Sequence, residues 1–358
     1  MSVIHQLFQG KRVLITGHSG FKGSWLSLFL LELGASVYGI SEDIPTSPSL
    51  FELANLNKQV KSVWTDINNF SAIKKEIQRI KPDFIFHAAA QPITSVGYSD
   101  PLKTFQTNIM GTVHILEVLK HLQKECVAIL ITSDKCYENK EWVWGYREID
   151  MLGGKDPYSA SKAAAELVIR SYYESFFRQT DGRIKILSVR AGNIIGGGDW
   201  STHRLIPDCI RHWQQNKPVP IRNPRAIRPW QHVLDAIYGY LLAAYRLHEK
   251  PELNGEAYNF GPPAEAALSV LEVVKAFSAY FKLPDLTYQT ITSSEFKEAS
   301  TLKLNSDKAH AHLGWKAQLN ISDTLKLTAQ WYKSFLSGNK NMRAFTQNQI
   351  RNFLREAQ

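Results

Sequence analysis

The stretch Lys11-Arg-Val-Leu-Ile-Thr-Gly-His-Ser-Gly-Phe-Lys-Gly23 decides the fold of this chain. Its first six residues form an apolar run that predicts a buried strand, and Phe21 to Leu33 then predicts a helix. Glycines at the spacing G-x-x-G-x-x-G join the two elements: Gly17, Gly20 and Gly23. Such a turn lets backbone approach a pyrophosphate at the positive end of a helix. We therefore predict a dinucleotide site at residues 17–23.

Short apolar strands recur through the first half of the chain, with helices between them. Further strands are predicted at 35–40, 83–90, 127–133 and 185–192, and helices at 101–122 and 158–177. Strands that alternate with helices indicate a parallel, doubly wound sheet. The wholly apolar run 128–131 suits a sheet buried on both faces. The predicted fold class is therefore α/β, of the Rossmann type.

The pattern changes after Gly192, which suggests a second, smaller unit. A triple-glycine loop at 196–198 leads into a segment rich in Pro, Arg and Trp that runs to Trp230. Helical periodicity returns at 232–248, and 257–261 has the character of another sheet strand. We predict a dinucleotide-binding domain at 1–190, to which 232–261 returns, and a smaller α/β substrate-binding domain over most of 191–358.

Composition excludes several classes of protein. Of 358 residues, 44% are apolar and 21% charged, as is usual for a soluble globular protein. The longest candidate membrane segment, 25–40, is interrupted by Glu32 and Gly34. Since only 16 residues precede Gly17, we expect no secretion signal and a cytoplasmic protein.

Neither metal binding nor nucleic-acid binding is favoured. The three cysteines are widely spaced, which suggests reduced thiols, and the histidines at 18, 87 and 232 lack metal-ligand spacing. The net charge of +9 is spread along the chain, and its tightest basic cluster is Arg222, Arg225 and Arg228. A modest positive field suits a small anionic substrate such as a diphosphate ester.

The end of the second strand bears on the choice of cofactor. An acidic residue usually binds the ribose of NAD there, but Ser41 stands at that position, and Glu42 and Asp43 follow it. Two carboxylates without an arginine repel a 2′-phosphate, so NAD is favoured over NADP. Asp66 and Ile67, after another strand-like segment, are either an adenine cap or ordinary loop residues.

Tyr158-Ser-Ala-Ser-Lys162 begins a helical segment. A spacing of four places Tyr158 and Lys162 on one helix face. A lysine cation stabilises a phenolate, so we expect the pKa of Tyr158 to lie below its ordinary value of about 10. A tyrosinate can remove a hydroxyl proton while hydride leaves the same carbon for a nicotinamide.

Ser133-Asp134-Lys135 follows a predicted strand, at the edge where open α/β sheets place their ligands. Ser133 is positioned to hydrogen-bond a substrate hydroxyl beside Tyr158. Asp134 and Lys135 form an acid and base pair, whose alternative interpretation is a solvated salt bridge in a loop.

Together these motifs resemble the extended short-chain dehydrogenase/reductase family. The likeness rests on the glycine turn, the strand end at Ser133, the Tyr158/Lys162 pair and the segments 108–112, 190–193, 313–315 and 331–332. Within the family, segments 17–25, 88–92, 134–137 and 196–200 are most similar to nucleotide-sugar 4,6-dehydratases that act on CDP-glucose. The dTDP-glucose dehydratases carry glutamate where Lys135 stands, and the epimerases lack the acid pair after the serine.

The resemblance, with the residues singled out above, implies a set of site residues. The predicted NAD-binding residues are Gly17, Ser19, Gly20, Phe21, Gly23, Glu42, Asp43, Asp66, Ile67, Ala88, Ala89, Ala90, Tyr158 and Lys162. The predicted substrate-binding residues are Gln91, Asn108, Asn193, Arg204, Arg222 and Arg228. Asn193 and Arg228 are the main candidates for the diphosphate, and Asn108 is alternatively a structural or capping residue.

The implied reaction belongs to deoxysugar biosynthesis. It oxidises C4 of the glucosyl group, eliminates water across C5 and C6 and returns hydride to C6, with Asp134 as the acid and Lys135 as the base. Alternatives are another nucleotide-sugar dehydratase, a 4-epimerase or a non-catalytic NAD-binding regulator. The resemblance also implies a homodimer or homotetramer that pairs through helices 107–122 and 158–177, although the apolar residues of these helices could equally belong to the core.

Overall fold

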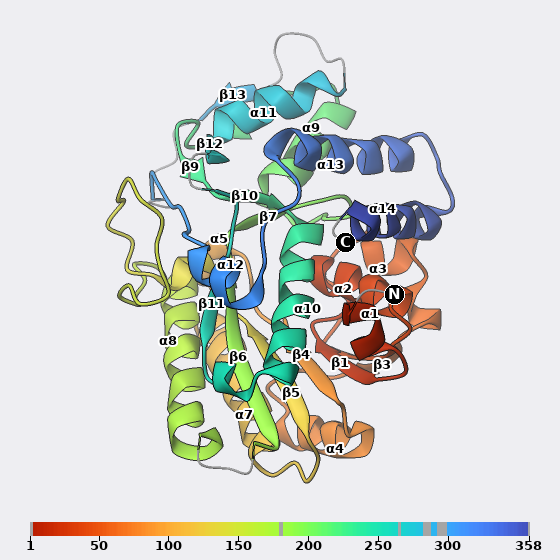
Figure 1. The fold of residues 1–358 in the computed structure, drawn as a ribbon. Helices are drawn as coiled ribbons and strands as arrows, with labels where there is room; N and C mark the ends of the chain where they lie inside the picture. The colour runs from red at the N-terminus through yellow and green to blue at the C-terminus, as the bar shows by residue number, and fades with distance from the viewer. Residues whose placement is uncertain (1–2, 179–181, 264–265, 282–287, 292–298, 357–358) are drawn as a thin grey trace.

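The computed structural model describes residues 3–178, 182–263, 266–281, 288–291 and 299–356. At its centre lies a seven-stranded sheet whose members, in spatial order, are β11 (Ala257–Phe260), β6 (Ile184–Ala191), β5 (Cys126–Ile131), β4 (Phe84–His87), β1 (Arg12–Thr16), β2 (Ser36–Ser41) and β3 (Lys61–Trp64). Every neighbouring pair in this sheet is parallel. Helices cover both of its faces (Figure 1), which confirms the predicted doubly wound α/β fold.

The remaining elements are as follows. The helices are α1 (Val3–Phe8), α2 (Phe21–Glu32), α3 (Leu50–Leu53), α4 (Phe70–Ile80), α5 (Thr94–Ser99), α6 (Pro101–Phe105), α7 (Gly111–Lys120), α8 (Pro157–Tyr172), α9 (Leu205–Gln214), α10 (Val233–Glu249), α11 (Val270–Ala279), α12 (Asp307–Leu313), α13 (Ile321–Leu336) and α14 (Met342–Glu356). Short or wide helical turns are η1 (Leu56–Lys58), η2 (Gln106–Met110), η3 (Asp134–Cys136), η4 (Tyr173–Phe177) and η5 (Pro251–Leu253). Small strands outside the main sheet are β7 (Asn193–Ile195), β8 (Val219–Ile221), β9 (Ile227–Arg228), β10 (Trp230–His232), β12 (Leu268–Ser269) and β13 (Tyr288–Thr290).

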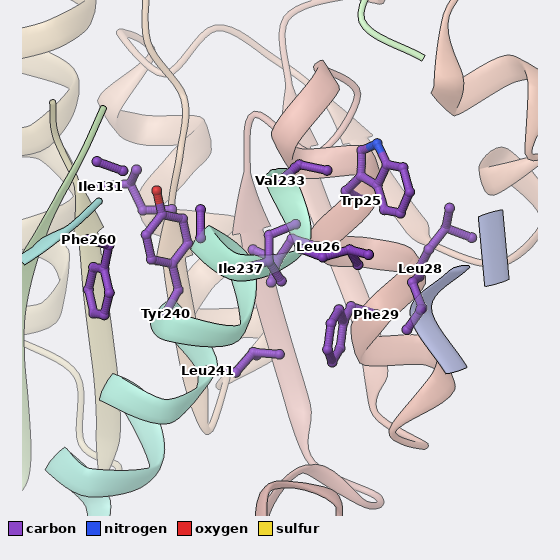
Figure 2. Packing of buried hydrophobic residues seen from close by; sticks show 14 of the residues in the cluster. Trp25, Leu26, Leu28, Phe29, Ile131, Val233, Ile237, Tyr240, Leu241 and Phe260 are labelled. Atoms are coloured by element: carbon purple, nitrogen blue, oxygen red, sulfur yellow. The ribbon is translucent and has the colours of Figure 1, made fainter. Parts of the chain in front are cut away.

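Alternate residues of each central strand enter two separate cores. In β1, Val13 and Ile15 join the core on the side of α2 and α10, whereas Leu14 joins the core on the side of α4, α7 and α8. This burial on both faces explains why the strands are apolar without alternation. Figure 2 shows α2 and α10 packed through their side chains: Trp25, Leu26, Phe29, Ile237 and Leu241.

Segment 232–261 supplies α10 and β11, and β11 pairs with β6 in the main sheet. The elements α9, α11 and α13 lie over the edge where the strands end (Figure 1). The division into two domains near residue 190 stays a prediction. None of the helices in the described segments is both long enough and apolar enough to cross a membrane.

Several predicted elements differ in detail from the structure: for example, the helix predicted at 158–177 consists of α8 and the π-type turn η4, and the strand predicted at 127–133 ends at residue 131. The helix predicted at 101–122 consists of α6, the π-type turn η2 and α7, with Asn108 buried inside the wide turn. Strand β4 ends at His87 rather than at residue 90. The alanines at 88–90 instead leave the sheet at its carboxyl edge, where the backbone N–H of Ala88 donates to the Thr16 carbonyl at 3.1 Å.

The triple-glycine loop is a packing element between distant parts of the chain. The Gly197 carbonyl accepts a hydrogen bond from the indole of Trp25 at 2.9 Å. A Cβ on Gly197 would lie 1.9 Å from Cγ of Trp331, and a Cβ on Gly198 would lie 2.9 Å from Cβ of Leu50. Only glycine therefore lets α2, α3 and α13 meet around this loop.

Gly197→Ala is expected to destabilise the fold, because its methyl group collides with a fully buried indole. Overpacking of this kind costs about 1–3 kcal/mol or more of unfolding free energy. Chemical denaturation measures the loss, with Gly153→Ala as the control, since its Cβ meets only the Glu138 side chain, at 3.2 Å. Equal stabilities for the two variants would contradict this account of the loop.

Candidate active site

The glycine turn at residues 17–23 is shaped for close approach of a ligand. Gly17 has a φ of +74°, and a Cβ there would lie 2.8 Å from the Ala89 nitrogen. A Cβ on Gly23 would lie 2.1 Å from the Gly17 carbonyl oxygen, so this glycine lets helix and turn pack together. A Cβ on Gly20, by contrast, would lie 3.5 Å from its nearest described neighbour, the Gly17 carbonyl oxygen. Gly20 begins α2 without a side-chain cap, which leaves the helix N–H groups facing an open cradle.

A hydroxyl and an imidazole occupy the place where the ribose-binding acid was expected. Ser41 Oγ lies 2.8 Å from Nδ1 of His18 and accepts from the Ser19 backbone N–H at 3.3 Å. His18 Nε2 lies 2.8 Å from Ser62 Oγ, so its ring joins the glycine turn to β2 and β3. Burial lowers the pKa of His18 to about 4, which keeps the imidazole neutral. Ser41 therefore helps to hold the glycine turn in place through its bonds with His18 and Ser19.

Other predicted cofactor residues lie in the turn after β1 and in the segments that follow β2 and β3. Ser19 donates its hydroxyl to the Asp43 carbonyl at 2.5 Å, which fixes residue 43 beside the turn. Glu42 is exposed and lies 3.7 Å from the Lys103 ammonium. Asp66 accepts from the Asn68 backbone N–H at 2.8 Å, and Ile67 packs against Gly111.

The turn after β5 places Ser133, Asp134 and Lys135 at the carboxyl edge of the sheet. Ser133 Oγ donates to Asp134 Oδ1 at 2.9 Å and accepts from the Lys135 backbone N–H at 3.2 Å. The other oxygen of Asp134, Oδ2, is buried and has no hydrogen-bond partner among the described residues. Burial raises the pKa of Asp134, which is the direction that a proton donor requires.

Tyr158 and Lys162 project from the first turns of α8 toward the same edge. The Lys135 ammonium lies 6.0 Å from the centre of the Tyr158 ring. Lys162 donates to the Ile131 carbonyl at 3.4 Å, and burial lowers its pKa to about 8. The structure thus brings together the five residues predicted to be catalytic.

The expected direction of the Tyr158 pKa is wrong for the protein alone. Burial raises this pKa to about 12, and a hydrogen bond with Ser133 and the charge of Arg204 only partly oppose the effect. Burial raises the pKa of the phenol more than nearby positive charge lowers it. The size of the burial effect does not follow from the four-residue spacing between tyrosine and lysine.

Lys22 is a site residue that sequence reasoning missed. It stands inside the glycine motif, between the predicted NAD-binding residues Phe21 and Gly23. Burial lowers its pKa to about 7, and repulsion from Lys162 and Arg204 acts in the same direction. A charged residue one position after the Gly-Phe pair, at the start of a buried helix, was the available signal.

Two predicted substrate ligands, Gln91 and Asn108, are hydrogen-bonded within the protein. Gln91 donates its amide to Thr104 Oγ1 at 2.8 Å and accepts from the Ile93 N–H at 2.6 Å. Asn108 accepts from the Gln91 N–H at 2.8 Å and donates to the Gln91 carbonyl and to Ser161 Oγ. The polar atoms of both side chains are thus engaged in hydrogen bonds that connect the loop after β4 with neighbouring helices, η2 included. A substrate contact from Gln91 or Asn108 stays a prediction, and the structural alternative for Asn108 is supported by these bonds.

The remaining predicted substrate residues come from the chain after β6. Asn193 begins β7, and its Oδ1 is buried without a partner in the described part of the chain. Arg204 donates to Asp199 Oδ2 at 3.1 Å, and Arg228 donates to the carbonyls of Ile227 and Ala299 at 2.9 and 2.7 Å. The charge of Arg228 reaches Asp134, whose pKa it lowers against the larger effect of burial. Arg222 directly follows β8, apart from the catalytic turn in sequence.

The described residues include no group of three or more His, Cys, Asp or Glu side chains that could hold a metal ion. His87 and His232 are instead hydrogen-bonded inside the protein. His87 Nδ1 lies 2.7 Å from Thr16 Oγ1, and the His232 ring accepts from the Leu234 N–H at 3.2 Å, at the start of α10.

Comparison with known proteins supplies the family. A family model described as GDP-mannose 4,6 dehydratase matches residues 14–328. CDP-glucose 4,6-dehydratase of Salmonella typhimurium is 46% identical over 334 residues, covering 92% of this chain and 93% of the relative. dTDP-glucose 4,6-dehydratase of Haemophilus influenzae is 27% identical over 342 residues, covering 89% and 97% of the two chains.

A solved structure shows the same fold. The dTDP-glucose 4,6-dehydratase of Bacillus anthracis, solved with NAD, has a TM-score of 0.77 at 20% identity and covers 93% of this chain and 100% of its own. The matches in sequence and in fold agree with the resemblance drawn from the motifs. The chain belongs to the GDP-mannose 4,6 dehydratase family of nucleotide-sugar enzymes.

Proposed function

We propose that this enzyme converts CDP-D-glucose to CDP-4-dehydro-6-deoxy-D-glucose, with NAD as its cofactor. One observation carries the proposal: Asp134 presents a buried, unpartnered carboxyl oxygen beside Tyr158, with Ser133 hydrogen-bonded to both residues. A site that only oxidises and re-reduces C4 needs Tyr158 and Lys162 but no protonated carboxyl. The 4-epimerase alternative is therefore disfavoured.

NAD fits the residues present. The open cradle at Gly20 and the uncapped start of α2 suit a pyrophosphate, and the carboxylates at 42 and 43 disfavour a 2′-phosphate. When bound, NAD would accept hydride from C4 of the sugar, return it to C6 and bring positive charge to the site. A nearby positive charge lowers the pKa of a phenol, so it would oppose the effect of burial on Tyr158.

The protons balance within the site. Tyr158 takes the C4 hydroxyl proton during oxidation, and Lys162 stabilises the phenolate. The C4 ketone acidifies the C5 proton, which Lys135 removes. The C6–O bond then breaks, and Asp134 donates its proton so that water leaves. Lys135 returns a proton to C5, and the proton held by Tyr158 replaces the one lost from Asp134 through the hydroxyl of Ser133.

The substrate diphosphate is assigned to polar and positively charged residues from the chain after β6. Asn193 Oδ1 is buried and lacks a partner among the described residues, which supports a substrate contact from Asn193. Arg204, Arg222 and Arg228 are the arginine candidates, since a guanidinium can donate two parallel hydrogen bonds to phosphate oxygens.

The cytidine base rests on the relative that is 46% identical over most of this chain. Incubation with CDP-, dTDP-, UDP- and GDP-glucose, followed by the ultraviolet absorbance of the ketone product in base, tests it. We expect the largest kcat/KM with CDP-glucose. A larger value with another nucleotide would reassign the base, and absence of a ketone with every substrate would overturn dehydration.

Assembly and compartment are part of the same proposal. Apolar side chains of Leu102, Met110 and Leu167 are 67%, 44% and 56% exposed along α6, η2 and α8, which supports pairing of two copies in a homodimer or homotetramer. The cysteines Cys126, Cys136 and Cys209 are buried free thiols, in keeping with the reducing cytoplasm.

The enzyme is expected to prefer NAD over NADP, because Glu42 and Asp43 meet a 2′-phosphate with negative charge. Competition titrations that follow displacement of bound NAD measure the preference. The double variant Glu42→Gln/Asp43→Asn should narrow the difference in affinity. Equal affinities of the two dinucleotides for the wild-type enzyme would contradict this assignment.

Tyr158→Phe is expected to lower the rate of sugar oxidation by roughly 10²–10⁴-fold, the usual contribution of a placed proton-transfer group. NAD binding should survive, because the ring is retained. Tyr172→Phe on the same helix is the control, since its hydroxyl contacts Glu117 at 3.1 Å, away from the site. Near-normal oxidation by Tyr158→Phe would exclude Tyr158 as the base.

Asp134→Asn and Lys135→Ala are expected to block elimination more strongly than oxidation. Substrate should then leave reduced nicotinamide absorbance on the enzyme, and Lys135→Ala should lose exchange of solvent deuterium into C5. Lys140→Ala is the control, because Lys140 lies in the following loop and pairs with Glu138 at the surface. If Lys135→Ala exchanges C5 at the wild-type rate, another group is the base.

A further inference from the structure

A buried ion pair lies one helical turn beyond the catalytic lysine. Tyr158, Lys162 and Glu166 follow one another at intervals of four on α8, so they share a helix face. Arg190 of β6 donates to Glu166 Oε2 at 2.7 Å, and the two side chains are only 4% and 3% exposed. Neither residue takes part in the proton transfers described above.

This ion pair is bonded to both ends of the turn that carries Asp134 and Lys135. Before the turn, the Thr132 hydroxyl donates to Glu166 Oε1. After it, the Tyr137 hydroxyl accepts from Arg190 Nη1 at 2.8 Å. Residues 133–136 are therefore held between two hydrogen bonds that end on one ion pair.

Each member of the arrangement is anchored to the main sheet. The Ser188 hydroxyl of β6 donates to Glu166 Oε2 at 2.8 Å. The Tyr137 hydroxyl donates in turn to Asn259 Oδ1 of β11 at 2.7 Å. The ion pair thus connects the end of β5, helix α8 and the neighbouring strands β6 and β11 at one edge of the sheet.

Stability alone does not account for such a pair. Removing two charges from water is costly, and apolar residues of similar size often serve a fold as well or better. The pair does fix geometry, because its hydrogen bonds are charge-assisted and directional. The acid–base turn and the Tyr158/Lys162 helix face must both reach one sugar ring, in two successive steps.

We propose that Glu166 and Arg190 are positioning residues that hold the Asp134–Lys135 turn in register with Tyr158 and Lys162. This inference rests on the proposed dehydratase function. Oxidation needs only the helix face, whereas elimination needs the turn at the correct distance from it. Loosening the turn therefore slows elimination before it slows oxidation.

Tyr137→Phe and Thr132→Val each release one end of the turn and leave both charges in place. Product formation should fall by roughly 10-fold or more, since displacements of about 1 Å cost up to ~10²-fold in rate. Sugar oxidation should fall less, so that reduced nicotinamide absorbance accumulates with substrate. KM should stay near the wild-type value, because the diphosphate ligands are untouched.

Tyr146→Phe is the matched control. Tyr146 is buried and stacks on Tyr137 with ring centres 5.2 Å apart, but its hydroxyl bonds Asn139 and the Lys140 N–H instead of the ion pair. Thermal unfolding of all three variants measures the general effect of losing a buried hydroxyl. The control should lower Tm as Tyr137→Phe does and leave the balance of oxidation and elimination unchanged.

A second arm tests Glu166 itself. Its negative charge raises the pKa of Lys162 against the larger lowering by burial. Glu166→Gln should therefore move the basic limb of the oxidation rate to lower pH, and Glu166→Asp, which keeps the charge, should restore it. A merely structural residue would change Tm and leave the pH profile in place.

The outcomes separate the two proposals. A wild-type enzyme that neither oxidises nor dehydrates a nucleotide sugar refutes the proposed function, and with it the positioning role. A wild-type dehydratase whose Tyr137→Phe and Thr132→Val variants oxidise and eliminate in wild-type proportion overturns the positioning role alone. Accumulation of reduced nicotinamide in these two variants but not in Tyr146→Phe supports it.

Discussion

Parallel pairing of the seven central strands is the constraint on which the site depends. Because every strand of the sheet runs in the same direction, the segments after β1, β4, β5 and β6 all leave at one edge. That edge receives the glycine turn, the alanines at 88–90 and the turn η3. Helix α8 begins beside η3 and adds Tyr158 and Lys162. Distant parts of the sequence thus meet at one edge of the sheet.

Burial governs the chemistry of this edge. It raises the pKa values of Asp134 and Tyr158 and lowers those of Lys162 and Lys22, so each group is pushed toward its neutral form. A protonated carboxyl suits the departure of a hydroxyl group. A protonated phenol cannot act as a base. The proposed oxidation by Tyr158 therefore requires a bound cation that lowers the pKa of its phenol. The same dry environment therefore favours elimination directly and oxidation only when the cofactor is present.

The sheet, and the meeting of the five catalytic candidates at its carboxyl edge, could be predicted from the sequence because both follow local rules. Each pattern can be recognised within a few consecutive residues: the apolar strands, the glycine turn and the Tyr-x-x-x-Lys spacing. The hydrogen bonds of Gln91 and Asn108 could not be predicted this way, because they join residues far apart in the sequence. Asn108 accepts from the Gln91 N–H and donates to the buried Ser161 hydroxyl. The same holds for Ser41, whose partner is the imidazole of His18. Glu166 and Arg190 were likewise invisible as a pair, since they meet only in the folded chain.

The central claim is that this site removes water from the sugar instead of only inverting C4. The most direct test is mass and NMR analysis of the product formed from CDP-glucose by the wild-type enzyme in deuterium oxide. Dehydration predicts a 4-keto-6-deoxy sugar that has lost one water molecule and carries deuterium at C5. A product of unchanged mass with hydrogen at every ring carbon would contradict the account and indicate epimerisation.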